Sequence, residues 1–455
     1  MLDTNKSLPS KLMADYILRS AESFFKNEAS SSILLLLSSL AAIVWANSFF
    51  APAYEKLLHI PITLGLGTHE ITKTLVHWIN DGLMTFFIFV VGLEIKREIL
   101  VGELSSRKNA LLPVVGALGG MLVPGAIYLG FNHGTPTEHG WGIPMATDIA
   151  FALGAIAVFG KKLPVGLRVF LSAFAIADDL GAVVIIALFY TKGIVWHYLA
   201  VCILFIIGLA IANLLWIRWT LIYALLGLGI WVAVLGSGVH PTVAGFVVAL
   251  FIPARGKYDT DRFVTRVKEI MDEFQCEEQS CGYSILLDKG HLNAVNALEM
   301  ACHDVETPLQ RLERSLHPWI AFALLPIFAF ANAGLSLMGM SFIDLVNQPL
   351  TMGITLGLFI GKPLGIATFS FLAVKTGMAV LPAEVRWSQV LGASMLGGIG
   401  FTMSLFVSGL SFSSPDMINY SKLGILMGSI LSALAGLMFL GLSCTLNKTK
   451  GDTHE

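Results

Sequence analysis

Several ionisable residues lie in the middle of apolar stretches, where a charged side chain is costly. They are Asp148 in IPMATDIAFALG, the adjacent Asp178 and Asp179 in LSAFAIADDLGAVVIIALF, and Lys362 in LGLFIGKPLGIATF. On insertion scales, a charge at the centre of a membrane helix costs at least about 2.5–3.5 kcal/mol. Because ionisable residues at this depth are functional by default, we take these residues as the candidate site.

These residues do not balance as ion pairs. One aspartate can pair with Lys362 in a purely structural role, but two carboxylates then stay unmatched. An unmatched carboxylate in a low-dielectric site either keeps its proton or binds a cation. Neighbouring residues on a helix point about 100° apart, so Asp178 and Asp179 can border one cavity. Their oxygens suit a hard cation, and we predict a site that holds either sodium or protons.

Two predicted membrane helices carry residues that break a helix. Pro144 and Thr147 precede Asp148, and a glycine cluster interrupts a later stretch at Gly397, Gly398 and Gly400. Glycine costs about 1 kcal/mol per residue inside a helix, and broken backbone at membrane depth is tolerated only around a cavity. Asp148 and Lys362 have the opposite signs needed to neutralise opposite helix ends. Close packing between helices is the alternative explanation of the glycines, and sequence spacing alone leaves it open.

The composition requires most of the chain to lie in lipid. The 455 residues are 55% hydrophobic and 13% charged, with a mean hydropathy of +0.74. Soluble domains carry about 25% charged residues, so this chain has too few polar side chains to cover a surface in water. The net charge of −2 gives no reason to expect nucleic acid as a partner. We predict an all-α polytopic membrane protein in a lipid bilayer.

Apolar runs of about 20 residues predict the transmembrane helices. About twelve occur, near residues 31–50, 80–99, 109–131, 143–159, 165–190, 196–216, 218–236, 238–254, 317–338, 350–374, 387–411 and 421–443. Of the 29 Lys and Arg residues, Lys362 falls inside a span, and only a few fall on the side opposite to the termini: Lys56, Lys73, Lys192 and Lys422. Because cytoplasmic loops carry the excess of Lys and Arg, we predict that both termini are cytoplasmic.

The apolar spans and the stretches between them divide the chain into segments, and β-branched residues that alternate with Gly and Pro over 51–72 suggest a hairpin there. We expect a cytoplasmic amphipathic N-terminus at 1–30, membrane helices 1–8 at 31–254 with an external hairpin at 51–72, a cytoplasmic helical insertion at 255–316, membrane helices 9–12 at 317–443 and a cytoplasmic tail at 444–455.

The sequence resembles a known family over nearly all of these spans. The matching stretches are INDGLMTFFIFVVGLEIKREI, GWGIPMATDIAFALG, FAIADDLGAVVIIALFY, SGVHPTVAGFVVALFIP, LHPWIAFALLPIFAFANAG, IGKPLGIATF and GGIGFTMSLFV. They resemble the NhaA-type sodium/proton antiporters, a known example of inverted-repeat transporters. The resemblance implies inverted repeats, two broken and crossing helices, and a homodimer formed through the external hairpin.

The implied activity is pH-regulated, electrogenic exchange of Na+ or Li+ for H+ in the bacterial inner membrane, for sodium and pH homeostasis. Sodium and proton binding fall to Asp178 and Asp179. Charge compensation at the helix breaks falls to Thr147, Asp148, Lys362, Gly397, Gly398 and Gly400. pH regulation falls to Glu94, Arg97, Glu98, Glu313 and His240. We expect no cofactor beyond the transported ions, and no enzymatic activity.

The chain departs from the family pattern in two places: the insertion is longer, and Arg314 replaces a histidine, although His317 is retained. Other function classes fit less well. A sodium-coupled symporter of an organic anion needs a pocket for the organic group, and adjacent carboxylates repel an anion. A magnesium-dependent intramembrane enzyme needs acids one helical turn apart, as in D-x-x-x-D. A passive channel would be slowed by two carboxylates that bind cations tightly.

Overall fold

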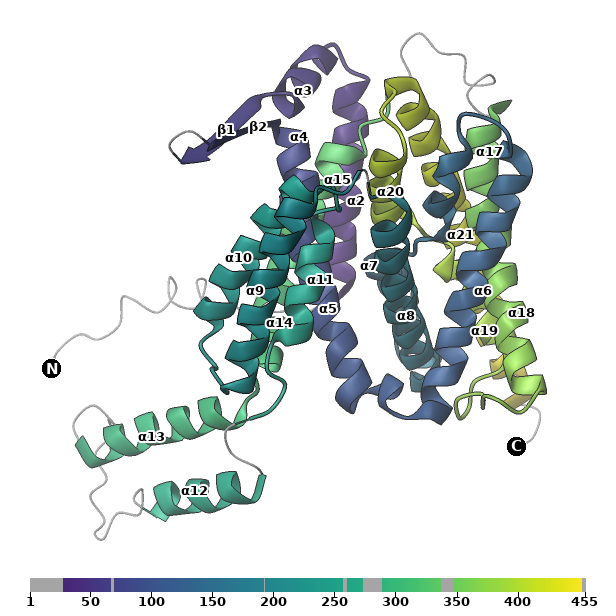
Figure 1. Ribbon diagram of the computed structural model, residues 1–455. Helices are drawn as coiled ribbons and strands as arrows, with labels where there is room; N and C mark the ends of the chain where they lie inside the picture. The colour runs from purple at the N-terminus through teal and green to yellow at the C-terminus, as the bar shows by residue number, and fades with distance from the viewer. Residues whose placement is uncertain are drawn as a thin grey trace, which may run out of the picture.

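The described part of the chain is built almost entirely of helices (Figure 1). The computed structural model describes residues 28–66, 69–191, 193–256, 260–272, 289–336 and 347–451. Most of the predicted N-terminal segment 1–30 and the last residues of the predicted tail, 452–455, therefore lie outside the described residues.

The first third of the chain contains the small sheet and the first long helices. Its elements are α2 (Glu28–Ala46), α3 (Ala51–Leu58), β1 (Pro61–Leu66), β2 (His69–Thr74), α4 (Leu75–Trp78), η1 (Ile79–Leu83), α5 (Met84–Val101), η2 (Glu103–Ser105), α6 (Arg107–Asn132), η3 (Glu138–Met145) and α7 (Ile149–Ala157). The strands are antiparallel, with Pro61 opposite Thr74. Residues 51–58 of the predicted hairpin form helix α3, so the hairpin itself covers only 61–74.

The middle of the chain adds a helical bundle and the insertion. Its elements are η4 (Gly160–Lys162), α8 (Val165–Phe189), α9 (Trp196–Leu214), α10 (Thr220–Ser237), α11 (Thr242–Phe251), α12 (Thr260–Asp272) and α13 (Lys289–Val305). Gly238, with a φ of 85°, ends α10, because a glycine in the left-handed region is the usual stop of a helix. In the insertion, α12 and α13 pack through Ile270, Ala294 and Ala301.

The last third supplies the remaining long helices. They are α14 (Pro308–Trp319), η6 (Ile320–Leu324), α15 (Leu325–Asn332), α17 (Pro349–Leu356), η7 (Gly357–Gly361), α18 (Lys362–Lys375), α19 (Trp387–Gly397), α20 (Phe401–Ser411) and α21 (Pro415–Gly451). Helix α14, the first part of the ninth predicted membrane span, starts at Pro308, inside the predicted insertion, because Thr307 and Gln310 form a capping box there. Helix α21, which contains the twelfth predicted membrane span, continues to Gly451, through most of the predicted tail.

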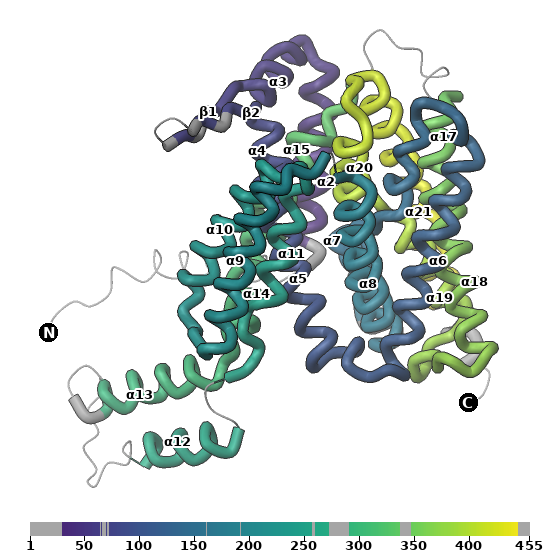
Figure 2. The backbone as a smooth tube through the Cα atoms, viewed as in Figure 1, coloured from purple at the N-terminus to yellow at the C-terminus, as the bar shows by residue number. Residues whose placement is uncertain are grey.

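The helices form two groups that meet at the middle of the molecule (Figure 2). In one group α5 packs on α11, α9 on α10 and α2 on α15; in the other, α6 packs on α8 and α18, and α21 on α17 and α19. We call the end that carries β1 and β2 the hairpin face, and the end that carries α12 and α13 the insertion face (Figure 1).

Each predicted span contains a helix of this structure. Within the described residues, eight helices are long and apolar enough to cross a bilayer, or up to ten if each of two bent helix pairs is one span. Helix α11 is apolar but shorter, and α5 combines an apolar run with the charged residues at 94–98. The protein is an all-α polytopic membrane protein.

Candidate ion-binding site

Two interrupted helices touch at their breaks. One chain segment changes from η3 to α7 at residues 146–148, and the other changes from α19 to α20 at 398–400 with a bend of 43°. The backbone N–H of Asp148 donates to the carbonyl of Ile399 at 2.6 Å, and Thr147 Oγ1 donates to the carbonyl of Gly397 at 3.0 Å. Breaking both helices therefore exposes backbone groups that each segment satisfies for the other.

The glycines in the second break are required by close approach. A Cβ on Gly398 would lie 2.5 Å from the carbonyl oxygen of Leu358, and one on Gly400 would lie 2.8 Å from that of Ala146. Both distances are shorter than side chains tolerate. Close packing and helix breaking, which the sequence left as alternatives, thus occur together at this cluster.

Charged residues lie at helix ends of the opposite polarity. Asp148 Oδ1 accepts from the backbone N–H of Phe151 at 3.1 Å, and its Oδ2 accepts from the N–H and hydroxyl of Thr402 at 2.9 and 2.6 Å. Asp148 therefore neutralises the positive amino ends of both α7 and α20. Lys362 Nζ donates to the carbonyl of Met145, at the negative end of η3. This geometry agrees with the compensation that the residue signs predict.

The two adjacent aspartates on α8 have different surroundings. Asp178 Oδ2 forms an ion pair with Lys362 Nζ at 2.8 Å, and both side chains are fully buried. Asp179 is also buried, at 1% exposure, but neither of its carboxylate oxygens has a hydrogen-bond partner among the described residues. The lysine thus neutralises one carboxylate, while the other is available to a ligand or a proton.

A cavity of about 120 Å³ leads from Asp179 toward the insertion face. Its walls include Thr147, Asp148, Asp179 and Thr402 at the crossing, and Glu94 and His317 further along. Asp178 is absent from the walls, because the turn of about 100° between neighbours points its side chain to Lys362. The carboxylate that has no hydrogen-bond partner within the described residues is therefore the one that faces the cavity.

Charged residues gather around the insertion-face end of this cavity. Arg97 forms ion pairs with Glu313 at 2.6 Å and with Glu98 at 2.8 Å. His317 Nδ1 lies 3.6 Å from Glu94 Oε1. The structure therefore brings Glu94, Arg97, Glu98 and Glu313 into one cluster. Arg314 pairs instead with Glu306, at 2.9 Å.

His240 is not part of that cluster. It precedes α11 at the hairpin face, where its Nε2 lies 3.9 Å from Asp81 Oδ1 and its Nδ1 lies 2.8 Å from Thr242 Oγ1. Its ring packs edge-on against Phe406 of α20, with 5.4 Å between the centroids. The predicted pH-regulating residues thus lie at both faces of the protein.

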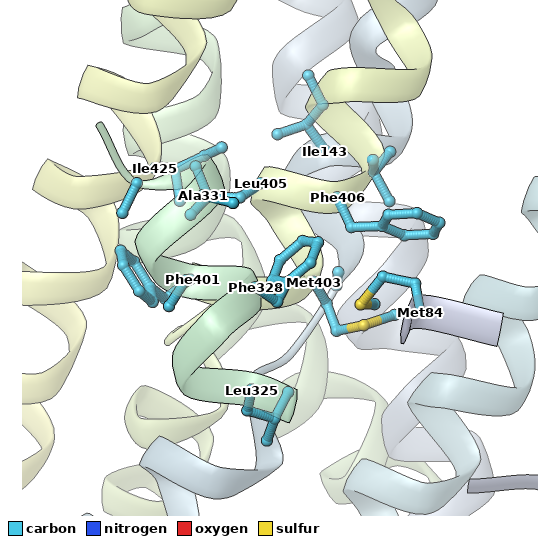
Figure 3. Packing of buried hydrophobic residues seen from close by; sticks show 14 of the residues in the cluster. Met84, Ile143, Leu325, Phe328, Ala331, Phe401, Met403, Leu405, Phe406 and Ile425 are labelled. Carbon is cyan, nitrogen blue, oxygen red and sulfur yellow. The ribbon is translucent and has the colours of Figure 1, made fainter. Parts of the chain in front are cut away.

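Apolar side chains close the cavity toward the hairpin face. Leu325 and Met403 line the cavity and belong to a buried cluster that also contains Met84, Phe328 and Phe406 (Figure 3). Phe406 in turn contacts His240. The structure therefore has a cavity with ionisable side chains in its walls between Asp179 and the insertion face, and an apolar barrier between Asp179 and the hairpin face.

Sequence reasoning missed two contributors to this region. Thr402 supplies two of the donors to Asp148. It could have been predicted from the sequence, because it lies just after the glycine cluster, where a hydroxyl and the backbone N–H groups at a helix start can donate to a carboxylate. The other is Lys96, which donates to the carbonyls of Leu250 and Ile252 at 2.6 and 2.5 Å, at the end of α11. Nothing in the sequence distinguishes Lys96 from its charged neighbours.

Comparisons with known proteins identify the family of the chain. The profile of a family described as Na+/H+ antiporter 1 matches residues 22–440. The chain is 45% identical over 439 residues to the Na(+)/H(+) antiporter NhaA of Koribacter versatilis, covering 96% of this chain and 93% of the relative. It is 45% identical over 427 residues to Na(+)/H(+) antiporter NhaA 1 of Saccharophagus degradans, covering 93% and 91%. It is 43% identical over 421 residues to the NhaA of Citrobacter koseri, covering 92% and 96%. The chain therefore belongs to the NhaA family of Na+/H+ antiporters.

Proposed function

We propose that this protein exchanges sodium or lithium for protons across the bacterial inner membrane, and that Asp179 binds the transported ion. The observation that carries the proposal is the asymmetry of the aspartate pair. Asp178 is neutralised by Lys362, whereas the buried carboxylate of Asp179 has no hydrogen-bond partner in the described structure and faces a cavity. Such a carboxylate is stable only with a proton or a cation bound.

Competition for Asp179 is sufficient to couple the two ion fluxes. The same oxygens hold either a proton or a sodium ion, so a proton that arrives from one side displaces sodium toward the other. The cavity volume of about 120 Å³ supports ions as the substrates, because sites for organic molecules usually measure about 300 Å³ or more. Neighbouring carbonyl and hydroxyl oxygens can complete the coordination of a hard cation.

We assign the insertion face to the cytoplasm and the hairpin face to the outside. The support is the distribution of Lys and Arg, since Lys56, Lys73 and Lys422 are among the few that belong to the hairpin face. In this orientation the cavity admits cytoplasmic sodium. The Glu94, Arg97, Glu98 and Glu313 cluster lies at its mouth, where it can tune exchange with cytoplasmic pH.

The first test is proton movement in inside-out membrane vesicles when sodium is added. We expect sodium to dissipate a preformed pH gradient in vesicles with the wild-type protein, and more strongly at alkaline pH, because fewer protons compete. Asp179→Asn should abolish the response. Asp416→Asn is the matched control, because Asp416 is exposed at the start of α21 and does not line the cavity. Equal responses from wild type and Asp179→Asn would refute the assignment of this carboxylate.

The second test addresses charge movement. Besides Asp179, the crossing holds Asp178 and Lys362, so it can carry more than one proton for each sodium ion. Exchange is then electrogenic, and a membrane potential imposed with potassium and valinomycin should change the rate of sodium movement in proteoliposomes. A rate that does not respond to the potential would indicate electroneutral exchange.

A second copy of the chain is the proposed partner at the hairpin face. In the part of the chain that the structure describes, the sheet of β1 and β2 has two strands, so each strand has one edge without a partner strand. Such edges pair readily with another chain. We expect light scattering of the purified protein, corrected for bound detergent, to give the mass of two chains. The mass of a single chain would contradict the dimer.

A further inference from the structure

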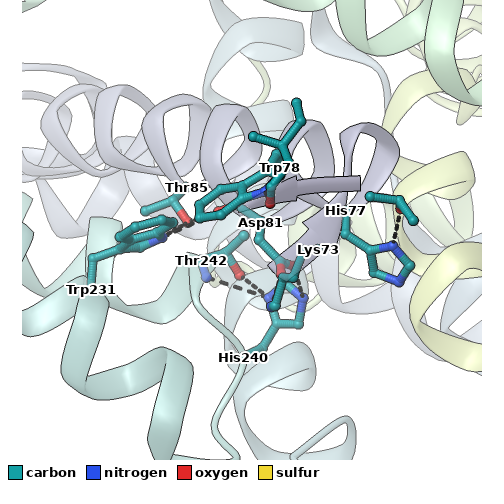
Figure 4. Close-up of polar contacts among 10 residues, drawn as sticks. Lys73, His77, Trp78, Asp81, Thr85, Trp231, His240 and Thr242 are labelled. Atoms are coloured by element: carbon teal, nitrogen blue, oxygen red, sulfur yellow. Dashed lines mark hydrogen bonds and ion pairs between the residues drawn. The ribbon is translucent and has the colours of Figure 1, made fainter. Parts of the chain in front are cut away.

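A second charged group lies on the far side of the apolar barrier, at the hairpin face. Lys73 Nζ forms an ion pair with Asp81 Oδ2 at 2.6 Å, and His240 Nε2 approaches the other oxygen of Asp81 at 3.9 Å (Figure 4). The Asp81 side chain is 14% exposed and that of Lys73 is 31% exposed. Asp81 is therefore a largely buried carboxylate whose main counter-ion can still reach water.

The three residues belong to different parts of the fold. Lys73 is on strand β2, Asp81 is in the π-helical turn η1, and His240 lies two residues before the start of α11. A π-helical turn inserts an extra residue into a helix and often occurs at functional sites, because it redirects the side chains that follow. The ion pair thus joins the hairpin to the helix whose lower part, α5, carries Glu94 and Arg97.

The backbone of Asp81 is held without help from Lys73. Trp231 Nε1 donates to the carbonyl of Asp81 at 3.3 Å, and the Thr85 hydroxyl donates to the same carbonyl. The hairpin has its own attachment, since Trp78 Nε1 donates to the carbonyl of Ile62 at 3.1 Å. Losing the ion pair would therefore leave both elements in position, which is what an exchangeable counter-ion requires.

The position of Asp81 relates it to the ion path. His240, which faces Asp81, packs on Phe406, and Phe406 belongs to the apolar cluster that closes the cavity above Asp179. Phe406 also lies on α20, the half-helix that begins at the break next to Asp148. Any opening of the barrier by a movement of α20 would therefore bring the path out beside Asp81.

We infer that Asp81 is a second cation-binding carboxylate, at the hairpin-side mouth of the path, and that Lys73 is its exchangeable counter-ion. The inference rests on the proposed sodium/proton exchange. While Lys73 is paired with Asp81, the ammonium group cancels the negative charge of the carboxylate, which then does not attract a departing sodium ion or an arriving proton. Partly exposed ion pairs are weak, so a monovalent cation can replace the ammonium group. The hairpin then limits cation binding at this face only.

The sidedness of the effect separates this inference from a purely structural role. Full-length protein is reconstituted in proteoliposomes, with the orientation determined by labelling. The sodium concentration for half-maximal exchange is then measured separately from each face. Lys73→Gln should lower that concentration at the hairpin face by about two- to fivefold, as expected for one partly exposed ion pair, and should not change it at the insertion face. Asp81→Asn should raise it at the hairpin face.

Two further variants control for folding and for charge. Lys73→Arg keeps the ion pair and should behave as wild type at both faces. Lys56→Gln removes a positive charge from the exposed surface of the neighbouring helix α3 and should have no effect. Equal changes at both faces, or no change with Lys73→Gln, would overturn the inference and leave the pair as an anchor of the hairpin. A wild-type protein without sodium-driven proton movement would overturn the proposed exchange as well.

Discussion

Two groups of charged residues, one at the helix crossing and one at the insertion face, lie at opposite ends of the same cavity and differ in burial. At the crossing, Asp148 and Asp178 are 2% and 1% exposed, and Lys362 is fully buried. In the cluster at the insertion face, the side chain of Arg97 is 38% exposed and that of Glu94 is 21% exposed. Water can therefore reach the guanidinium of Arg97 and replace a lost partner there, although Glu98 and Glu313 are only 15% and 11% exposed. It cannot do so for the charged groups at the crossing.

The contrast shows why similar residue types serve different purposes. In the dry crossing, removing one charge leaves its partner buried and unpaired, so each residue has one role that no other can take over. In the wet cluster, Arg97 pairs with two glutamates at once, and the loss of any one contact is shared among the rest. Binding an ion needs the first arrangement, and sensing the surrounding solution needs the second.

The largest effect on stability is expected from breaking the buried pair. Lys362→Met should destabilise the protein by about 3–5 kcal/mol, because it leaves the carboxylate of Asp178 buried without a cation. The measurement is the midpoint of thermal unfolding in detergent, followed by tryptophan fluorescence. The double variant Lys362→Met/Asp178→Asn should recover most of the loss, because it removes both charges together. If the single variant were as stable as wild type, burial at the crossing would not make the loss of a counter-ion costly, and the contrast with the exposed cluster would fail.

The same contrast explains which residues of the site can be predicted from the sequence. Asp178, Asp179, Asp148 and Lys362 were identifiable because a charge within an apolar run is conspicuous at any position along it. The sequence did not reveal which aspartate takes the lysine. That choice depends on a helix rotation of about 100° and on where α18 lies, which is a property of packing.

Boundaries and surface contacts were less accessible to sequence reasoning. The start of α14 at Pro308 depends on a local capping box that overrides the polarity of the segment, which favoured an insertion up to residue 316. The alternation of β-branched residues with Gly and Pro over 51–72 predicts a hairpin, but residues 51–58 form helix α3, which has a proline in its first turn. The separation of His240 from Glu94 likewise follows from the three-dimensional arrangement and not from spacing.

An intermediate effect is expected at the donor that the sequence missed. Thr402→Val keeps the side-chain shape but removes the hydroxyl that donates to Asp148 Oδ2, while the backbone N–H of residue 402 still donates. We expect a loss of about 1.5–3 kcal/mol in the same unfolding measurement, as for a hydrogen bond to a charged group.

Thr351→Val is the matched control for that variant. Thr351 is equally buried, but its hydroxyl donates to an uncharged carbonyl, that of Tyr420, at 3.0 Å. We expect a loss of only about 0.5–1.5 kcal/mol, because the acceptor carries no charge. Equal losses from the two variants would show that the charge on Asp148 contributes nothing to the crossing.

The smallest effect on stability is expected in the wet cluster, where the change should appear in the pH profile instead. Arg97→Gln should cost less than about 1 kcal/mol, because the ion pairs are partly exposed. Removing this positive charge makes the mouth of the cavity more negative and concentrates protons there. Half-maximal exchange should therefore move to higher pH, by less than about 0.7 unit. The shift should shrink in high salt, because salt screens exposed charges.

Arg266→Gln is the control, since Arg266 forms an exposed pair with Glu269 in the insertion, away from the cavity. A shift that does not depend on salt, or an equal one with Arg266→Gln, would contradict an electrostatic role for the cluster.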